Sequence, residues 1–258
     1  MRRIPRWGRL RNRGDRVIRP VAASRMTHAF SPCMVSLSVR DILGELTPVE
    51  QKLAPGVLHV AGDVDLLRTS PKVAVVGSRR ASTEGLTNAT RVAETLVGLD
   101  ATVVSGLAQG IDAAAHKAAL RARGRTFAVI GTGLDVAYPS ANRPLQEHLM
   151  TDFAVVSQFR TGTPPARRHF PQRNRTMALL SDALVIVEAA QNSGTVSQGW
   201  ETLRLGRTLF LLESVVNNPV LSWPAEMRRY GAEVLRLEDL GHILDDLPCV
   251  TMSGALGF

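Results

Sequence analysis

Residues 73–79 read Val-Ala-Val-Val-Gly-Ser-Arg, and this stretch decides the fold. Its four apolar, mostly β-branched residues predict a buried strand, and Gly77 predicts a turn that leads into a helix. A glycine at the end of a strand leaves backbone N–H groups accessible, and the dipole of the following helix adds positive potential. We therefore expect an anion site at Gly77 and Ser78, with Arg79 holding a phosphate through two N–H groups.

The same turn has a simpler interpretation. Ser82 or Thr83 would act as the N-cap of the helix, and the turn would then hold no ligand. The stretch matches neither the G-x-G-x-x-G pattern nor the Walker A loop, which counts against NAD and ATP as ligands.

Short apolar runs recur along the chain at the spacing of a parallel sheet. Strands are predicted at 73–76, 102–104, 127–130, 155–156, 184–187 and 209–212. Helix-length amphipathic segments lie between most of them, at 85–99, 111–123 and 198–205. A weaker helix and strand follow at 222–230 and 234–237. This rhythm predicts an α/β fold with a doubly wound, mostly parallel sheet.

The formal net charge of +8 is concentrated at the start of the chain. Residues 1–25 hold nine arginines and one acidic residue, Asp15, which sum to +8, so the other residues sum to about zero. An attraction for polyanions therefore has to come from a local patch or from this segment. Met26 and Met34 are alternative starts that would remove most of the excess charge.

We expect four segments along the chain. Residues 1–35 lack periodicity and mix Arg with Gly and Pro, which predicts a disordered, Arg-rich segment. Residues 36–71 are expected to form a short helical and extended lead-in, with a short helix near 39–52. Residues 72–247 form the α/β domain, and residues 248–258 form a flexible tail.

The cysteines and the apolar runs indicate in which cellular compartment the protein acts. Cys33 and Cys249 lie far apart and outside any metal-ligand spacing, so we expect neither a disulfide nor a zinc site. No apolar run approaches the length of a membrane span, and the start lacks the apolar region of a secretory signal. These features favour the cytoplasm and count against a membrane partner.

Two further turns repeat the strand–turn–helix geometry. In Ser105-Gly-Leu-Ala-Gln-Gly110, Gly106 and Gly110 allow a close approach of the backbone to a ligand. Ser193, Gly194 and Thr195 begin a helix after the fifth strand, which is a position suited to phosphate. By contrast, Gly131-Thr-Gly133 indicates only a turn.

Residues 167–175 read Arg-Arg-His-Phe-Pro-Gln-Arg-Asn-Arg and follow the fourth strand. We expect a loop at the carboxyl edge of the sheet, stiffened by neighbouring prolines, Pro171 among them. Arginines there contact phosphates, and Phe170 offers a face on which a base stacks. Asn174 reads a base edge or caps the helix that begins near it. In the alternative interpretation, Phe170 anchors the core and the arginines form a solvated face.

The chain shows no recognisable catalytic constellation. His116 lies on an Ala-rich helix without a Cys, Ser or carboxylate partner, so we expect a packed or capping histidine. We find no nucleophile with its base, no carboxylate pair at catalytic spacing and no metal-ligand cluster. We therefore predict a binding protein without cofactor or metal, and not an enzyme.

In their order and spacing, these motifs resemble the DprA/Smf family, bacterial DNA-processing proteins that protect incoming single strands and load the RecA recombinase. Residues 58–62 fit the entry strand of that family. The other matching pieces are Val-Ala-Val-Val-Gly-Ser-Arg79, Val-Val-Ser-Gly-Leu-Ala-Gln-Gly-Ile-Asp-Ala-Ala-Ala-His116, Ala-Val-Ile-Gly-Thr-Gly-Leu-Asp135, Tyr-Pro-Ser-Ala-Asn-Arg143 and Phe-Pro-Gln-Arg-Asn-Arg175.

The resemblance implies an extended Rossmann-like fold, usually dimeric, which binds single-stranded DNA and assists RecA-mediated recombination in natural transformation. It implies a phosphate pocket at the first turn, a base on Phe170, and phosphate contacts along the strand from Arg173 and Arg175, with Arg167 at a commonly basic position. The residues expected to bind DNA are Gly77, Ser78, Arg79, Arg167, Phe170, Arg173, Asn174 and Arg175. The expected phosphate loops hold Gly106, Gly110, Ser193, Gly194 and Thr195.

The chain departs from the family after the fifth strand. Residues 196–200 read Val-Ser-Gln-Gly-Trp where members often continue into a Leu-Ile-Thr helix, and residues 213–218 replace the usual Pro-Gly turn. We find no winged-helix-like segment after them. These departures bear on RecA loading more than on strand binding.

Two other functions stay open at this point. One is a nucleotide-processing enzyme of the related LOG group, which carries a Glu at the third position after the Thr of its Gly-rich turn. This chain has Gln198 there, which counts against hydrolysis. The other is a nucleotide-sensing module that binds a small phosphorylated ligand in the same pocket. Binding that depends on strand length would favour DNA over such a ligand.

Overall fold

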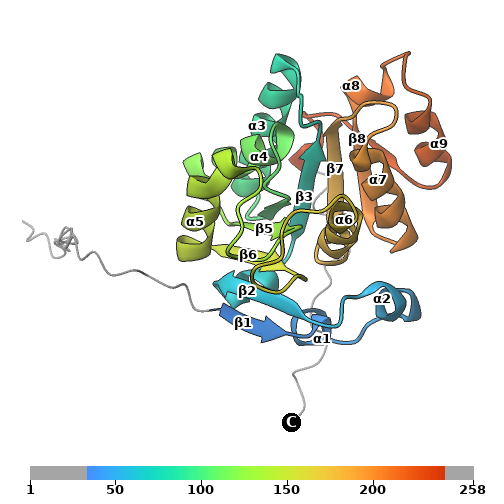
Figure 1. The fold of residues 1–258 in the computed structure, drawn as a ribbon. Helices are drawn as coiled ribbons and strands as arrows, with labels where there is room; N and C mark the ends of the chain where they lie inside the picture. Colours follow the sequence, from blue (N-terminus) through green and yellow to red (C-terminus); the bar gives the residue numbers. More distant parts are fainter. Residues whose placement is uncertain (1–33, 242–258) are drawn as a thin grey trace, which may run out of the picture. The chain divides into compact units, whose positions relative to one another are not determined.

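The computed structural model describes residues 34–241, and its strands form one nine-stranded sheet (Figure 1). The strands are β1 (Met34–Leu37), β2 (Leu58–Gly62), β3 (Lys72–Gly77), β4 (Thr102–Ser105), β5 (Thr126–Ile130), β6 (Ala154–Ser157), β7 (Ala183–Glu188), β8 (Thr208–Leu212) and β9 (Glu233–Leu235). Their order is β1-β2-β6-β5-β4-β3-β7-β8-β9. The seven strands from β6 to β9 in this order run parallel, and β1 and β2 are added antiparallel at one edge.

Helices connect the strands in two sets, and the two sets of connections move toward opposite edges of the sheet. The helices are α1 (Val39–Leu43), α2 (Pro48–Leu53), α3 (Thr83–Gly98), α4 (Ile111–Arg121), α5 (Arg143–Asp152), α6 (His169–Leu179), α7 (Gly194–Arg204), α8 (Glu213–Val216) and α9 (Trp223–Arg229), with short 3-10 turns η1 (Val64–Leu67) and η2 (Ser140–Asn142). From β3 to β6 the chain moves toward one edge, and from β7 to β9 toward the other. The predicted doubly wound, Rossmann-like sheet is therefore confirmed.

The apolar runs seen in the sequence are the central strands. Val73, Ala74 and Val75 of β3 have no exposed surface, because helices cover both faces of a parallel sheet. α3 packs against α4 on one face, and α6 packs against α7 on the other (Figure 1). Each of the six strands predicted between residues 73 and 212 is present, and so is the weaker helix and strand that follow.

A buried cluster fastens the amino ends of the two central strands. One carboxylate oxygen of Asp182 accepts hydrogen bonds from the backbone N–H of Lys72 at 2.7 Å and from the Ser70 hydroxyl at 3.1 Å. The Lys72 ammonium donates to the carbonyl of Thr69 at 2.8 Å. This cluster adds to the parallel ladder that pairs β3 with β7 from Val73 to Gly77.

The segment before β3 belongs to the same sheet. β2 pairs with β6, and its Leu58 and Val60 are fully buried. The single helix expected near 39–52 is instead two short helices, α1 and α2. Gly44 has a φ of +75° that ends the first helix, and Thr47 caps the second. An ion pair between Glu50 of α2 and Arg207 ties this segment to the turn before β8.

The predicted disordered and flexible ends lie almost wholly outside the described residues. Met34 and Val35 were included in the first of them, but both belong to β1. Residues 1–33 and the tail at 248–258 are not described, so those predictions, and the domain boundary at residue 72, stay predictions.

We expected a loop over residues 167–175, but helix α6 begins within this stretch, at His169. Pro171 lies in the first turn of that helix, where a missing N–H group breaks no hydrogen bond of the helix. The proline therefore starts a helix here and does not stiffen a loop. Asn174 lies five residues inside the helix, so it is not the N-cap.

Candidate functional site

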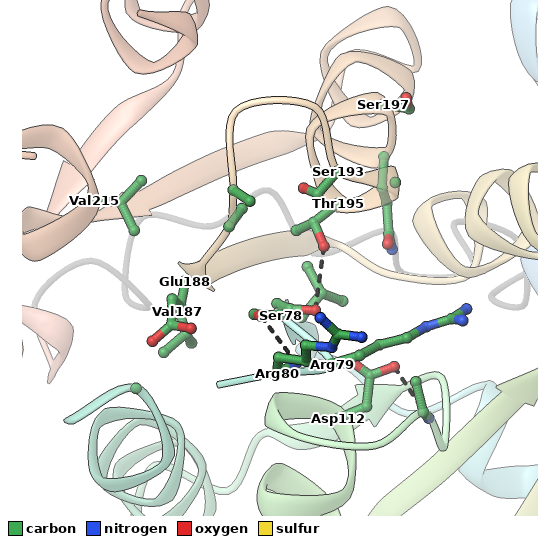
Figure 2. Close-up of a pocket in the computed structure, with 18 of the residues that line it drawn as sticks. Ser78, Arg79, Arg80, Asp112, Val187, Glu188, Ser193, Thr195, Ser197 and Val215 are labelled. Atoms are coloured by element: carbon green, nitrogen blue, oxygen red, sulfur yellow. Dashed lines mark hydrogen bonds between the residues drawn. The ribbon is translucent and has the colours of Figure 1, made fainter. Parts of the chain in front are cut away.

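A large cleft lies where the direction of the chain reverses across the sheet. β3 and β7 are neighbours, and their carboxyl ends lead toward the starts of α3 and α7. The cleft encloses about 1150 Å³. Figure 2 shows Ser78 and Arg79 at its centre, with Glu188 on the side of α3 and with Ser193 and Thr195 at the start of α7. In doubly wound folds, this reversal point is where ligands bind.

The turn after β3 fits tightly into its surroundings. A Cβ atom on Gly77 would lie 2.6 Å from Cγ1 of Ile111 and 2.8 Å from the Glu188 carbonyl oxygen, so a side chain has no room there. The Ser78 N–H donates to that same carbonyl at 2.8 Å. Thr195 at the start of α7 donates its hydroxyl hydrogen to the Gly77 carbonyl at 3.2 Å (Figure 2). The turn is thus fixed by its own contacts, and Arg79 extends from it into the cleft.

The positive end of α3 already holds a carboxylate of the protein. Glu188 accepts hydrogen bonds from the backbone N–H of Ser82 at 3.1 Å and from its hydroxyl at 2.5 Å. Ser82 is the N-cap and accepts the N–H of Gly85 at 2.9 Å, as the simpler interpretation of the turn predicted. A Cβ on Gly85 would lie 2.2 Å from the Glu188 carboxylate. The dipole of α3 therefore serves Glu188, and the side chains of Arg79 and Arg80 are left to attract an anion at this turn.

The start of α7 has no such cap. Ser193 is the N-cap, but its side chain makes no capping hydrogen bond. Its hydroxyl oxygen and the Nε2 atom of Gln198 are both buried, and within residues 34–241 neither has a hydrogen-bond partner. Gln198 is 3% exposed and borders the cleft. The predicted residues Ser193, Gly194 and Thr195 therefore line the cleft at an uncapped helix end.

The other two predicted glycines have a packing role. A Cβ on Gly106 would lie 1.3 Å from Nη1 of Arg173, and one on Gly110 would lie 2.2 Å from the Ser78 carbonyl oxygen. Gly110 also has a φ of +78°, which favours glycine. Neither residue lines the large cleft. These contacts account for both glycines without a bound phosphate.

The resemblance implied that Arg173 lies on the surface along a bound strand. In the structure, Arg173 is buried instead. It is 5% exposed, and its Nη1 atom lies 3.7 Å from a carboxylate oxygen of the equally buried Asp112. Burial raises the pKa of Asp112, and the guanidinium of Arg173 opposes that rise. The charge of Arg173 is thus directed at an internal partner, although the side chain borders the cleft.

Arg175 is also engaged within the protein. It donates to both carboxylate oxygens of Glu201, at 2.9 and 3.1 Å, in the two-point geometry of a guanidinium–carboxylate pair. The hydrogen bond to Glu201 raises the pKa of Arg175. Arg175 does not line the cleft. The neighbouring Asn174 does, and its side chain donates to the Gly194 carbonyl at 3.3 Å.

Phe170 and Arg79, predicted from segments far apart in the sequence, lie against each other. The guanidinium carbon of Arg79 is 4.9 Å from the centre of the Phe170 ring, which is a cation–π contact. Tyr138 lies beside the same ring, with the two ring centres 5.6 Å apart. Tyr138 is part of the sequence motif Tyr-Pro-Ser-Ala-Asn-Arg143, but its place beside Phe170 was not expected.

Several exposed arginines lie on the two loops that lead to α6 and α3, at the same edge of the sheet as these rings. Arg160, Arg167 and Arg168 lie before α6, and within residues 34–241 no carboxylate pairs with them. Arg80 follows Arg79 and is likewise exposed and unpaired in the part of the chain that is described. Arg167 is thus available to a ligand, and its expected contact with DNA stays a prediction. Arg160 was not predicted, because nothing in the local sequence distinguishes it.

The remaining titratable candidates are structural. His116 has no exposed surface, and its Nδ1 atom shares a 2.7 Å hydrogen bond with the Thr126 hydroxyl. Burial lowers the pKa of His116 from 6.5 to about 3, so the packed histidine that we predicted is confirmed and is neutral. Between residues 34 and 241, no three His, Cys, Asp or Glu side chains are arranged to hold a metal ion. Nor is any helix in that range long and apolar enough to cross a bilayer.

Comparisons with known proteins match this chain to one family. Residues 45–247 match the family model described as DNA recombination-mediator protein A. The chain is 45% identical over 159 residues to DNA processing protein DprA of Streptococcus pneumoniae, which covers 62% of this chain and 56% of that protein. It is 31% identical over 195 residues to DNA processing protein DprA of Bacillus subtilis, which covers 75% of this chain and 65% of that protein. The chain thus spans roughly half to two thirds of the length of these relatives.

Solved structures of two such proteins share the fold. The structure of DNA processing protein A from Streptococcus pneumoniae matches with a TM-score of 0.71 and 36% identity, covering 83% of this chain and 74% of that chain. DNA processing protein A from Helicobacter pylori, a protein with a single-stranded DNA binding mode, matches with a TM-score of 0.70 and 26% identity. That match covers 83% of this chain and 97% of the other.

Proposed function

Because this chain belongs to the DNA recombination-mediator protein A family, the DprA/Smf proteins, we propose that it binds single-stranded DNA at the carboxyl edge of its sheet. The strand lies across the Phe170 ring, and its phosphates contact arginines of the two loops around that ring. The single-stranded DNA binding mode of the Helicobacter pylori relative supports this proposal.

One observation carries the proposal. Arg79, Phe170 and the exposed arginines before α6 gather at one edge of the sheet, although they come from two loops about ninety positions apart. An aromatic ring in contact with one guanidinium group, at the same edge of the sheet as further arginines that have no carboxylate partner among the described residues, is the combination that single strands require. A surface that only kept the protein soluble would have no need to place a ring among these charges.

Arg79 has to move when a base binds. Its guanidinium covers one face of Phe170 at 4.9 Å, and on another side a Cβ on Gly131 would lie 3.2 Å from the ring. A base therefore stacks on Phe170 only after Arg79 has left that face. The freed guanidinium can then hold a neighbouring phosphate, so stacking and phosphate contact form together.

The interior of the cleft adds little net charge. Its charged lining residues are Arg79, Arg80 and Arg173 against Glu84, Asp112, Glu188 and Glu201. Two of these acids, Asp112 and Glu201, pair with Arg173 and Arg175. The attraction for DNA comes from the exposed arginines at the rim, and we expect the salt dependence of a few phosphate contacts rather than many.

The wider role follows from the family and is part of the proposal. We infer that the chain forms a homodimer, acts in the cytoplasm and delivers bound strands to a RecA-type recombinase without catalysing a reaction. The description of the family as a recombination mediator supports this role. The buried pair of Arg173 with Asp112 and the half-buried pair of Arg175 with Glu201 are also more suited to a rigid binding surface than to catalysis.

The test is fluorescence-anisotropy binding of labelled oligo-dT and of a duplex of equal length to the full-length protein. A second protein has the nine arginines of residues 1–25 replaced by glutamine, so that no arginine of this segment can attract DNA. Preference for the single strand that persists in this variant supports the site in the folded part. Binding that disappears with the nine arginines would assign it to the basic segment and refute the proposal.

A second candidate ligand is a small phosphorylated nucleotide. The uncapped start of α7, with the orphaned Nε2 atom of Gln198 beside it, favours this alternative because it offers an unused anion position. Competition separates the two candidates. If dTMP or a cyclic nucleotide displaces oligo-dT at micromolar concentration, and affinity does not rise with strand length, the small ligand is the natural one.

A further inference from the structure

Tyr138 presents an aromatic ring to solvent at the edge of the proposed DNA site. It is 44% exposed, whereas most large apolar side chains of the described residues are buried in the sheet. The chain has only two tyrosines, and Tyr230 lies elsewhere, against Trp200. An exposed aromatic ring near arginines differs from an isolated exposed ring. The ring can hold a base of a ligand while an arginine holds a phosphate of the same ligand.

The loop that carries Tyr138 is held in place. The Gly133 N–H donates to the Thr163 carbonyl at 2.9 Å, and the Thr132 hydroxyl donates to the Val136 carbonyl at 2.7 Å. The Asn142 side chain, at the far end of the loop, donates to the Leu107 carbonyl at 2.8 Å. The ring therefore stands on a fixed support, and little ordering of the loop is needed when a ligand arrives.

Tyr138 is more accessible than Phe170. Arg79 lies over one face of Phe170, and a Cβ on Gly131 would lie 3.2 Å from the ring on another side. The small cavity bordered by Tyr138, Phe170, Arg79 and Arg173 encloses about 60 Å³. That is room for about two water molecules and not for a base. Without any movement of side chains, the outer surface of Tyr138 is the aromatic surface that a base can reach.

Phosphate contacts are available beside this ring. The hydrogen bond from Gly133 to Thr163 joins the loop of Tyr138 to the segment between β6 and α6. That segment carries Arg160, Arg167 and Arg168, which are exposed and have no carboxylate partner within residues 34–241. A base on Tyr138 and the phosphate that follows it can therefore be held by two loops that are fixed to each other.

We propose that Tyr138 is a second base site, on which one base of the strand stacks while its neighbour stacks on Phe170. This inference rests on the proposed function. The ring centres lie 5.6 Å apart with the planes inclined at 36°. They form two separate platforms that meet at an angle, so the strand bends between the two bases instead of stacking them continuously.

The experiment compares two ligands of equal length, oligo-dT and the same sugar–phosphate chain without bases. Tyr138→Leu is expected to weaken oligo-dT binding about tenfold, because one stacked base is lost. Its affinity for the abasic chain and its salt dependence stay those of the wild type. Tyr138→Phe keeps the ring and binds as the wild type does. Tyr230→Leu, which removes the other tyrosine, is the matched control and leaves both affinities unchanged.

Three results would overturn the proposal while leaving strand binding intact. Equal oligo-dT affinity of Tyr138→Leu and wild type would mean that no base uses the ring. Equal losses for both ligands would mean that Tyr138 only positions the arginines. A change in the mass of the free protein by light scattering would make the ring a subunit contact. If the wild type does not bind oligo-dT at all, the proposed function itself fails.

A measurement on the unmodified protein covers the case in which Tyr138→Leu does not fold. Oligo-dT carrying 5-iododeoxyuridine is crosslinked by light, and the attached peptide is identified by mass spectrometry. The proposal expects attachment to Tyr138 and to Phe170. Attachment to Phe170 with none to Tyr138 at any position of the label would contradict it.

Discussion

The carboxylate of Glu188, at the end of β7, holds Ser82, the N-cap of helix α3, by accepting the N–H and the hydroxyl of Ser82 at 3.1 and 2.5 Å. An acidic side chain thus occupies the place in which a doubly wound fold commonly holds a ligand phosphate. It joins the start of α3 to the neighbouring strand, and it adds negative charge to the cleft.

Replacing Glu188 is expected to change stability and binding in opposite directions. Glu188→Ala removes the hydrogen bonds that hold the N-cap Ser82 and lowers the free energy of unfolding by about 1 kcal/mol. It also frees the positive end of α3, so oligo-dT binds a few-fold more tightly. Chemical denaturation and anisotropy measure the two effects. Glu84→Ala removes the same charge from the cleft but keeps the hydrogen bonds between Glu188 and Ser82. Equal loss of stability in both variants would refute the role of Glu188 in holding Ser82.

Arg173 is expected to be needed for folding more than for binding. Arg173→Met leaves Asp112 buried without its partner, which lowers the free energy of unfolding by about 3 to 5 kcal/mol. Arg175→Met breaks a more exposed pair and should cost about 1 kcal/mol or less. Urea denaturation of both variants checks this difference. Similar values for the two would contradict the internal role of Arg173.

The loss in Arg173→Met is also expected to depend on pH. Burial raises the pKa of Asp112 above its ordinary value of 3.8, and removing Arg173 takes away the charge that opposes the rise. A carboxyl whose pKa is higher in the folded state favours folding while protonated, so stability falls as the pH increases through that raised pKa. The variant should therefore be destabilised more at pH 8 than at pH 5, and the reverse order would refute the assignment.

His116 is expected to contribute to acid denaturation. Its pKa is about 3 in the folded protein against an ordinary 6.5, so protons bind the unfolded chain first. Stability from this group is complete above pH 6.5 and is lost as the pH falls toward 3. Between pH 7 and 4, His116→Gln should lose about 3 kcal/mol less stability than the wild type. Parallel pH profiles of the two proteins would contradict this.

Two arginines that look alike in the sequence should differ in DNA binding. Arg79→Ala removes a phosphate contact, so oligo-dT binding weakens and the slope of log affinity against log salt falls by about 0.7. Arg175→Ala breaks the pair with Glu201 and should leave that slope unchanged. Anisotropy titrations at several salt concentrations measure both. An unchanged slope in Arg79→Ala would exclude its phosphate contact.

Local patterns predicted the framework of the protein well. Val73 to Val76 could be assigned to a buried strand because a parallel strand covered on both faces requires a continuous apolar run. Ser82 could be named as a cap because an N-cap depends on one side chain and the next turn of backbone. Such features are decided within a few residues, so the sequence alone carries them.

The pairing of charges inside the site could not be predicted in this way. Arg173 and Arg175 have the same residue type and lie two positions apart, yet one is buried against Asp112 and the other lies against Glu201. Their partners come from α4 and α7, so the pairing depends on how helices pack. Glu188 was overlooked for the same reason, because its partner is Ser82, more than one hundred residues earlier.

The separation of buried ion pairs from exposed rim arginines has an evolutionary consequence. Arg173 and Asp112 can change only together, since either one alone is left as a buried charge. Arg160, Arg167 and Arg168 are exposed, so each can be exchanged with little effect on folding. Lineages can therefore adjust the strength of binding by single substitutions at the rim, while the architecture beneath is inherited almost unaltered.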